Sequence, residues 1–353
     1  MKEVRIWVVG LGTVGQWLLR AMHVHAPRLA DGYGFVPVVV GVANARDGFV
    51  HDSSGLDPQS VLVLASSRRS LTELDGIRHW PSSVEGLDAT EADVLVEVTA
   101  SPGDSGEPGV THMRTALQRG IPVVTSNKWP VALHGVELVA LAREKGVPFR
   151  AESTVMSGTP VLSTLVDGLA GARPISLRGI VNATANFILT RMEQGASYED
   201  ALAEAQRLRL AERNPTADVE GYDAMAKAMI LAGLVFGTQL LPEDVVRHGI
   251  STIDRAQIDA AASEGARIKE LVTLELSETG GAATLTARVE PTPLPGGDPL
   301  ADVSGVANAV VCRAEPVGEV MVRGPGAGPE LAGQGVFGDL IAVAQLVGRP
   351  ARG

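Results

Sequence analysis

Residues 4–22 read VRIWVVGLGTVGQWLLRAM, and this stretch decides the fold of the first half of the chain. The apolar run at 4–9 predicts a strand, and QWLLRAM has the periodicity of a helix. Between them, Gly10, Gly12 and Gly15 match the pattern G-x-G-x-x-G in the strand, turn and helix context that the motif requires. This order predicts a dinucleotide-binding unit at the start of the chain.

Each position of the turn has its own physical role. Gly10 permits the tight turn, Gly12 lets the backbone approach a pyrophosphate, and Gly15 lets the helix pack closely on the strand. The free N–H groups at the start of the helix, near Thr13 and Val14, then hold the phosphates. A flavin-type or S-adenosylmethionine-type variant, or a degenerate site, remains the alternative.

The residues after the second predicted strand, at 36–42, bear on the choice of cofactor. NAD sites usually place an acid there, which binds the ribose 2′-hydroxyl. Here Asn44 stands at about that position and Arg46 follows, which favours a 2′-phosphate and hence NADP(H) over NAD(H). Asp47 keeps NAD(H) open, and Arg46 as a solvated loop charge is the alternative.

The alternation of strands and helices predicts an α/β doubly wound sheet of the Rossmann type. Further strands are expected at 61–64, 93–98 and 121–124, with helices at 109–119 and 135–145. Ligands of such sheets lie beyond the carboxyl ends of the strands. Thr99 and Ser101 are therefore expected at the nicotinamide half of the site, and Lys128 beside it, with a surface lysine as the alternative for Lys128.

The second half has a different pattern, which predicts an α+β domain. We expect a strand at LRGIVN, helices near NFILTRME, at 197–209 and at 219–236, and strands at 270–276 and 283–289. A last helix is expected at 329–347, before a frayed tail RPARG. The expected domains are 1–150 for dinucleotide binding, 151–320 for substrate binding and dimerisation, and 321–353, which completes the first domain.

Composition excludes several classes of protein. The chain has 353 residues, a net charge of −11 and a pI of about 5.2, which argues against nucleic acid and anionic lipid as partners. Its single cysteine, Cys312, excludes an intramolecular disulfide framework and suits a reducing cytosol. No apolar run is long enough to span a membrane and no signal peptide is evident, so we expect a cytoplasmic protein.

Lysine is scarce: Lys128 and Lys227 are two of only five lysines among 30 basic residues. Where positive charge suffices the chain uses arginine, so a lysine can mark a site that needs a group able to lose a proton. Chance is the alternative explanation.

The stretch 211–227, AERNPTADVEGYDAMAK, places acids before Lys227. Asp218 is expected to cap a helix that begins near Val219, and Asp223 lies one helical turn before Lys227. Lys227 is the only charged residue between 224 and 236. Burial lowers the pKa of a lysine and a nearby carboxylate raises it, and such a balance suits proton transfer. A structural buried ion pair is the alternative.

Taken together, these residues resemble the homoserine dehydrogenase family. The resemblance covers nearly the whole chain and is carried by these segments: GLGTVG at 10–15, TSNK at 125–128, AESTVMSGTP at 151–160, GIVNATANFILTRME at 179–193, AERNPTADVEGYDAMAK at 211–227, PLADVSGVANAV at 299–310 and GPGAG at 324–328. The chain resembles the short form, without the regulatory ACT domain of longer members and without a fused aspartate kinase.

The resemblance implies NAD(P)-dependent interconversion of L-aspartate 4-semialdehyde and L-homoserine, on the route to threonine and methionine. It implies that Lys227 exchanges a proton with the carbonyl oxygen and that Lys128 stabilises the developing alkoxide. It also implies that Glu212 and Asp223 hold the substrate, with Asp218 and Asn214 beside them, and that the enzyme is a homodimer.

The resemblance further implies a structural Na⁺ at the hinge between the domains. The matching positions are Glu152, Val155, Ser157 and Thr159, of which the last three would act through backbone carbonyls, because a hard cation prefers oxygen.

The sequence departs from the family pattern at several positions. Asn214 stands where the family has Asp, Ala183 where it has Gly, and Leu331 where it has Thr. The loss of a charge at Asn214 leaves a dehydrogenase of a homoserine analogue as an alternative. A non-catalytic NADP-binding regulator is the alternative from another class.

Overall fold

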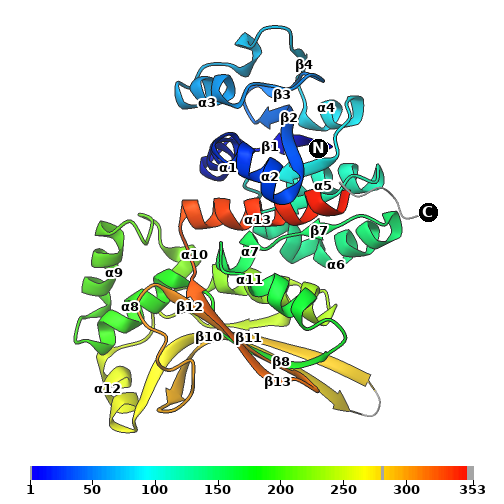
Figure 1. Ribbon diagram of the computed structural model, residues 1–353. Coiled ribbons are helices and arrows are strands. Elements are labelled where there is room, and N and C mark those ends of the chain that lie inside the picture. Colours follow the sequence, from blue (N-terminus) through cyan, green and yellow to red (C-terminus); the bar gives the residue numbers. More distant parts are fainter. Residues whose placement is uncertain (1, 280–281, 348–353) are drawn as a thin grey trace. The chain divides into compact units, whose positions relative to one another are not determined.

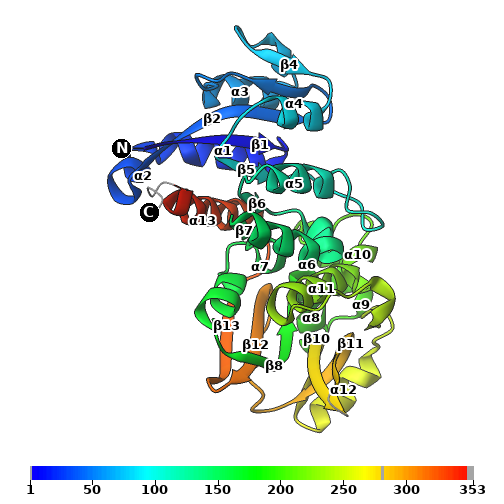
Figure 2. The ribbon, with the colours of Figure 1, turned by 90° about the vertical axis from the view of Figure 1, so that its right-hand side faces the viewer.

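The computed structural model describes residues 2–279 and 282–347, and its chain forms two compact units. Unit 1 comprises Met1–Gly158 and Gly328–Gly353, and unit 2 comprises Thr159–Ala327. The tail RPARG lies outside the described residues. Figures 1 and 2 show the ribbon of each unit from two directions.

Unit 1 is built on a seven-stranded sheet. The strands β2, β1, β5, β6 and β7 run parallel, while β3 and β4 extend the β2 edge in antiparallel fashion. In order across the sheet they are β4 (Arg78–Trp80), β3 (Gly48–His51), β2 (Phe35–Asn44), β1 (Lys2–Val9), β5 (Val94–Glu97), β6 (Val123–Thr125) and β7 (Phe149–Arg150).

Helices cover both faces of this sheet, because its inner strands are apolar on both sides. One face packs against α1, α3 and α13 through residues such as Leu18, Val61 and Leu340, and the other packs against α4, α5 and α6 through residues such as Leu87 and Met113. The helices of unit 1 are α1 (Thr13–Val24), α2 (Ala26–Tyr33), α3 (Pro58–Ser66), α4 (Ser83–Ala89), α5 (Gly109–Gln118), α6 (Lys128–Lys145), α7 (Ser153–Met156) and α13 (Pro329–Val347), with a 3₁₀ turn η1 at Leu71–Glu73.

The strand predicted at 61–64 is wrong, because these residues lie within α3. The side chain of Asp57 accepts hydrogen bonds from the N–H groups of Gln59 and Ser60, and Pro58 occupies the first helical position. This start signal outweighs the apolar run VLVL, which by itself fits a strand or a buried helix.

Unit 2 is built on a six-stranded mixed sheet. Its strands are antiparallel except for the pair β11 and β9. In order across the sheet they are β13 (Gly318–Pro325), β12 (Ala307–Glu315), β8 (Arg173–Ile180), β10 (Ala266–Thr279), β11 (Ala282–Pro295) and β9 (Val245–Arg247).

Helices α8 and α11 lie along one face of this sheet, as Figures 1 and 2 show. The apolar side chains of α8, α9 and α12 form a core with Ile250 and Ile268. The helical segments of unit 2 are η2, a π-helix (Ser163–Gly168), α8 (Ala183–Glu193), α9 (Tyr198–Arg207), α10 (Thr216–Val219), α11 (Tyr222–Phe236), the 3₁₀ turn η3 (Pro242–Asp244) and α12 (Arg255–Ser263).

The expected start of the long helix near Val219 is wrong. The short helix α10 ends at Val219, and α11 begins at Tyr222 after Gly221, which has φ 75° and offers no capping side chain. Because only glycine adopts this left-handed conformation readily, Gly221 separates the two helices. The α/β class with an α+β second part is confirmed, and the last helix occupies the predicted residues.

Candidate active site

The glycine turn of unit 1 has the close contacts that its motif predicts. A Cβ atom on Gly10, whose φ is 111°, would lie 2.7 Å from the carbonyl carbon of Val98, and one on Gly15 would lie 2.0 Å from the carbonyl oxygen of Gly10. A Cβ on Gly12 would meet no atom within 4 Å, so the backbone at this position faces open space. The turn therefore needs glycine at two positions for packing and leaves room for a ligand at the third.

A pocket of about 660 Å³ opens at this turn, at the N-terminus of α1. In the part of the chain that the structure describes, no side chain caps the N-terminus of α1, so the N–H groups of Thr13 and Val14 are donors of the kind that bind phosphate. The pocket is lined by residues of β1 and β2, of the segments that follow β1 and β5, and of helices, among them Gly10, Gly12, Asn44, Thr99 and His112. These residues fit a bound dinucleotide.

A hydrogen-bond network occupies the carboxyl ends of β5 and β6. The amide nitrogen of Asn127 donates to Oγ1 of Thr99 at 3.1 Å and to Oγ of Ser101 at 2.8 Å. The predicted site residues Thr99 and Ser101 are thus brought together by Asn127. Lys128 follows as the first residue of α6 and is half-buried.

Glu97 and His112 lie next to this network, and neither residue is among those predicted from the sequence. Glu97 is fully buried and accepts hydrogen bonds from the hydroxyls of Thr99 and Thr125. His112 lies between Oε1 of Glu97, 3.5 Å from Nδ1, and Oγ of Ser83, 2.6 Å from Nε2. An acid directly after the apolar run VLV at 94–96 was the available signal, since such an acid needs polar partners when buried.

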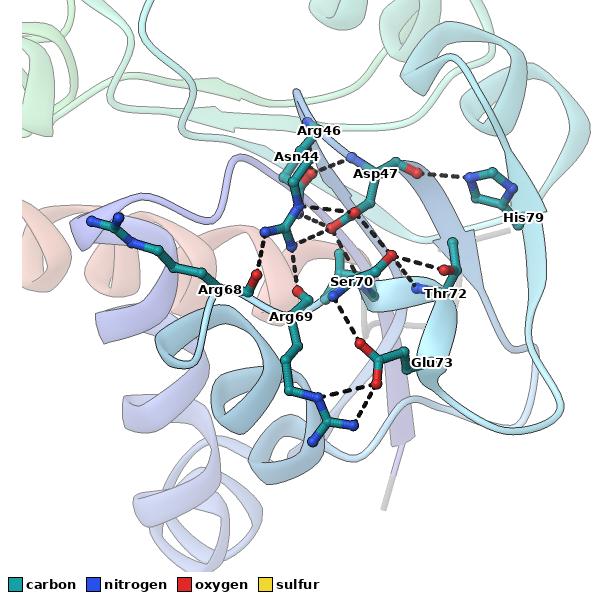
Figure 3. Close-up of polar contacts among 10 residues, drawn as sticks. Asn44, Arg46, Asp47, Arg68, Arg69, Ser70, Thr72, Glu73 and His79 are labelled. Carbon is teal, nitrogen blue, oxygen red and sulfur yellow. Dashed lines mark hydrogen bonds and ion pairs between the residues drawn. The ribbon is translucent and has the colours of Figure 1, made fainter.

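The end of β2 carries a second polar cluster, shown in Figure 3. Oδ1 of Asn44 accepts hydrogen bonds from the backbone N–H groups of Arg46 and Asp47, and its amide donates to Asp47 at 2.8 Å. The remaining donors to the Asp47 carboxylate are the Arg46 guanidinium, the Ser70 hydroxyl and the N–H of Leu71. Asp47 therefore ties the β2 turn to the segment 68–73.

Arg46 and Asp47 both direct most of their polar atoms to hydrogen-bond partners within this cluster. The guanidinium of Arg46 also donates to the carbonyl oxygens of Arg68 and Arg69, whereas the side chain of Arg68 extends away from the cluster (Figure 3). The hydrogen bond from Arg46 holds the pKa of Asp47 far below its ordinary value. Asp47 is thus ionised and saturated with donors from the protein, which leaves it poorly placed to bind a ribose hydroxyl.

In unit 2, Lys227 is buried within α11 and paired. Its Nζ lies 2.8 Å from a carboxylate oxygen of Asp223 and donates to the carbonyl oxygen of Val181 at 2.6 Å. Asn182, the next residue after Val181, donates from its amide to Asp218 at 2.8 Å and to Asp223 at 3.0 Å. The structure therefore brings together three predicted site residues, Lys227, Asp223 and Asp218, and adds Asn182.

The predicted capping role of Asp218 is wrong, because no side chain caps α11 among the described residues. Asp218 instead joins the Lys227 cluster by accepting a hydrogen bond from the amide of Asn182. Glu212 and Asn214 lie outside it, on the exposed loop before α10. Oδ1 of Asn214 accepts from the hydroxyl of Thr216 at 2.7 Å, which forms a local turn.

Glu270, on β10, was also missed. It is 3% exposed, and among the described residues its Oε1 has no hydrogen-bond partner. Burial, together with the charges of Asp223 and Asp218, raises its pKa to about 8.

The four positions expected to bind Na⁺ are divided between the units. Glu152, Val155 and Ser157 lie at α7 in unit 1, where the backbone N–H of Glu152 donates to Asp339 at 2.8 Å. Thr159 is the first residue of unit 2, and its hydroxyl donates to the carbonyl oxygen of Pro325 at 2.9 Å. Within residues 2–279 and 282–347, no group of three or more His, Cys, Asp and Glu residues could bind a metal ion.

Two family models match the chain. One describes homoserine dehydrogenase and matches residues 160–341, and the other describes the homoserine dehydrogenase NAD binding domain and matches residues 10–152. The chain belongs to the homoserine dehydrogenase family. Members of this family are oxidoreductases that act on a CH–OH group. The NAD binding domain model covers the glycine turn, and the homoserine dehydrogenase model covers the Lys227 cluster.

Two curated relatives agree with this assignment over nearly their full length. The chain is 37% identical to the NAD(+)-dependent homoserine dehydrogenase of Pseudomonas canavaninivorans, over 99% of this chain and 98% of the relative. It is 33% identical to the homoserine dehydrogenase of Sulfurisphaera tokodaii, over 96% of this chain and 98% of the relative.

Solved structures of the family share the fold. A homoserine dehydrogenase from Archaeoglobus fulgidus, described as putative, matches with a TM-score of 0.84 and 30% identity, over 96% of this chain and 99% of that one. A hyperthermophilic archaeal homoserine dehydrogenase in complex with NADPH matches with a TM-score of 0.79 and 30% identity, over 99% of both chains. No helix in the described part of the chain is long and apolar enough to cross a membrane.

The Asp47 cluster predicts a specific loss of stability. Asp47→Ala removes the common acceptor of the β2 turn and the 68–73 segment, and we expect the free energy of unfolding to fall by about 2 kcal/mol at pH 7. Because the pKa of Asp47 is lowered in the folded state, this difference should shrink as the pH falls below about 4. Chemical denaturation measures both effects.

Asp75→Ala, a change of an exposed carboxylate on the neighbouring segment, is the matched control and should leave the free energy of unfolding nearly unchanged. Equal losses in the two variants would contradict the anchoring role of Asp47.

Proposed function

We propose that this protein interconverts L-homoserine and L-aspartate 4-semialdehyde with NADP(H), and that Lys227 exchanges the proton. The observation that carries the proposal is the buried pair of Lys227 with Asp223, in which the lysine also donates to the carbonyl oxygen of Val181. A structural ion pair would add little stability at such a depth, whereas a fixed, buried ammonium suits proton transfer.

Lys227 acts on the oxygen of the reacting carbon. A bound nicotinamide supplies the hydride for reduction and accepts it in oxidation. In reduction the ammonium of Lys227 gives its proton to the carbonyl oxygen, and in oxidation the neutral amine takes the proton of the hydroxyl. Asp223 and the Val181 carbonyl fix the position of Nζ in both directions.

The polar residues at the strand ends of unit 1 serve the cofactor and the transition state. Thr99 and Ser101, fixed by Asn127, border the nicotinamide end, and Lys128 stabilises the developing alkoxide by its charge. Gly10, Gly12, Thr13, Val14 and Gly15 hold the pyrophosphate at the start of α1.

The acids of unit 2 serve the substrate. Glu212, Asp218 and Asp223 provide negative charge that suits the α-ammonium group of homoserine, and Asn214 adds a neutral acceptor. A cofactor pocket with free N–H donors also supports the alternative of a non-catalytic NADP-binding regulator, which would bind the dinucleotide without turnover.

The preference for NADP(H) over NAD(H) rests on the end of β2. Asn44 is neutral, and Asp47 already accepts from Arg46, Asn44, Ser70 and Leu71. No free carboxylate is therefore offered to a ribose 2′-hydroxyl by these two residues, while Arg46 and Arg68 bring positive charge. The names of relatives include both cofactors, since one relative is NAD(+)-dependent and another was solved in complex with NADPH.

Three further features belong to the same proposal. Glu152, Val155, Ser157 and Thr159 bind a structural Na⁺, for which oxygen ligands are suited. The protein is a cytoplasmic homodimer, and its reaction contributes to threonine and methionine biosynthesis.

Lys227→Arg tests the proton-transfer role. Arginine keeps the positive charge beside Asp223 but does not release its proton in water, so we expect kcat to fall by roughly 10²-fold or more with the fold retained. Initial rates with L-homoserine, and circular dichroism of the same samples, measure this. Lys145→Arg, at the end of α6, is the control and should keep normal rates; near-normal kcat in Lys227→Arg would refute the role.

Arg46→Ala tests the cofactor preference. Loss of the loop anchor affects both cofactors, but loss of a phosphate contact affects only NADP, so we expect kcat/KM for NADP to fall about tenfold more than that for NAD. Arg69→Ala, which breaks an ion pair with Glu73 in the same segment, should leave the ratio unchanged. An unchanged ratio in Arg46→Ala would remove Arg46 from the 2′-phosphate site.

Asn214→Asp tests the substrate. If the natural substrate is homoserine, a panel of amino alcohols should show homoserine as the best substrate of the parent protein, and the added charge should change its kcat/KM by less than about tenfold. A large gain for homoserine in the variant would instead favour a homoserine analogue as the natural substrate. Cofactor binding without turnover of any amino alcohol would favour the regulator.

A further inference from the structure

Glu270 is a buried carboxyl group that the proposed reaction does not use. It lies on β10, the central strand that pairs with β8 and β11. Its Oε1 lies beneath the turn at the start of α11, 3.4 Å from where a Cβ atom on Gly221 would stand. Among the described residues this oxygen accepts no hydrogen bond. A negative charge on Glu270 would therefore lack the kind of hydrogen-bond donor that Asn182 provides to Asp218 and Asp223.

The charged groups around Glu270 come from several elements. Asp223 and Lys227 lie on α11 and Asp218 on α10, and all three interact electrostatically with Glu270. Arg247, on β9, approaches the same turn, but its guanidinium donates to the carbonyl oxygen of Glu220 and lies over the Tyr222 ring at 3.8 Å. Lys269, the residue before Glu270 on β10, pairs with Glu193 at 2.9 Å.

The charge balance of this cluster favours a neutral Glu270. Lys227 already pairs with Asp223, and Asn182 donates to both aspartates, so these two carboxylates are the stabilised anions. A third carboxylate would be buried without a donor and beside two negative charges, which is strongly unfavourable. The same factors raise the pKa of Glu270 to about 8, so it keeps its proton at neutral pH.

We propose that Glu270 is a positioning residue for Lys227, which as the neutral acid fills the space behind the Asp223–Lys227 pair without adding a negative charge. The consequence concerns the proton of Lys227. An ionised Glu270 would hold that proton more tightly, whereas a neutral Glu270 leaves Lys227 able to release it and accept it again. This inference rests on the proposed role of Lys227 and adds to it a residue that sets the pH range of the proton transfer.

The first test concerns the protonation of Glu270 and needs no activity. Since its pKa is raised from 4.5 to about 8 on folding, the stabilising contribution of the neutral group is complete below pH 4.5 and is lost as the pH rises toward 8. Glu270→Gln, which cannot ionise, should show a clearly flatter decline of unfolding free energy between pH 5 and 8 in chemical denaturation. Glu275→Gln, an exposed change on the same strand, is the control and should keep the parent slope.

The second test concerns catalysis. In the parent protein, Glu270 ionises as the pH rises and adds a negative charge beside the Asp223–Lys227 pair, so the oxidation of homoserine should reach its plateau at a higher pH. In Glu270→Gln the rising limb of kcat/KM should move to lower pH, by about one pH unit. Glu275→Gln should superimpose on the parent profile. A merely structural role would lower the rates at every pH without moving the limb.

The outcomes separate this inference from the proposed function. An unchanged slope of stability in Glu270→Gln, or a rate profile parallel to that of the parent, overturns the role of Glu270 while leaving that of Lys227 intact. Near-normal turnover in Lys227→Arg instead overturns the proposed function, and the stability test of Glu270 still stands by itself. Glu270→Met, which also cannot ionise, replaces Glu270→Gln in both tests if the amide does not fold.

Discussion

The close packing of backbone on backbone at the first turn is the constraint on which unit 1 depends. A Cβ on Gly15 would stand 2.0 Å from the carbonyl oxygen of Gly10, and one on Gly10 would meet the backbone of Val98 and Thr99. Because these contacts leave no space for a side chain, α1 starts close above β1 and β5. The first N–H groups of α1 and the carboxyl end of β5 then face the same pocket, and the rest of the cofactor site is arranged around it.

In unit 2, a few hydrogen-bond donors are shared among several acidic side chains. The single amide of Asn182 serves Asp218 and Asp223, and Lys227 serves Asp223 and a backbone carbonyl. Each buried anion is thereby paired or hydrogen-bonded, as buried charges must be. The Gly221 turn permits this arrangement, because it separates α10 from α11 and lets Asp218 point toward Asn182 instead of capping the helix.

Elements with strong local signals could be predicted from the sequence, and elements defined by distant partners could not. The glycine turn, β1, β2 and the helix α13 were predicted because periodicity and turn residues mark them within a few positions. The run VLVL at 61–64 by itself fits a strand, whereas the capping carboxylate of Asp57 and Pro58 at the first helical position determine that it is helical. The strands β12 and β13 were missed; β12 pairs with β13 and with β8, and these partners are distant or follow only after the turn at 316–317.

The same distinction applies to the site residues. Lys227 and Asp223 are four residues apart on one helix, so their contact could be predicted. Glu97 and Glu270 each lie on a strand, and a glutamate in a strand ordinarily indicates a solvent-facing position. Their burial depends on the helices and strands packed around them. The apolar residues before Glu97 give a local hint of its burial, whereas the sequence of the strand around Glu270 gives none.

The anchoring of Arg46 has an evolutionary consequence. Its guanidinium donates to Asp47 and to the carbonyl oxygens of Arg68 and Arg69, so under the proposed function one side chain would serve both the cofactor preference and the support of the neighbouring segment. A lineage that exchanged this arginine to change its coenzyme would at the same time loosen the attachment of the segment 68–73 to the turn after β2. Compensating changes at Asp47 or Ser70 would have to accompany the exchange. Coenzyme preference in such a protein would therefore change by several substitutions together and not by one substitution alone.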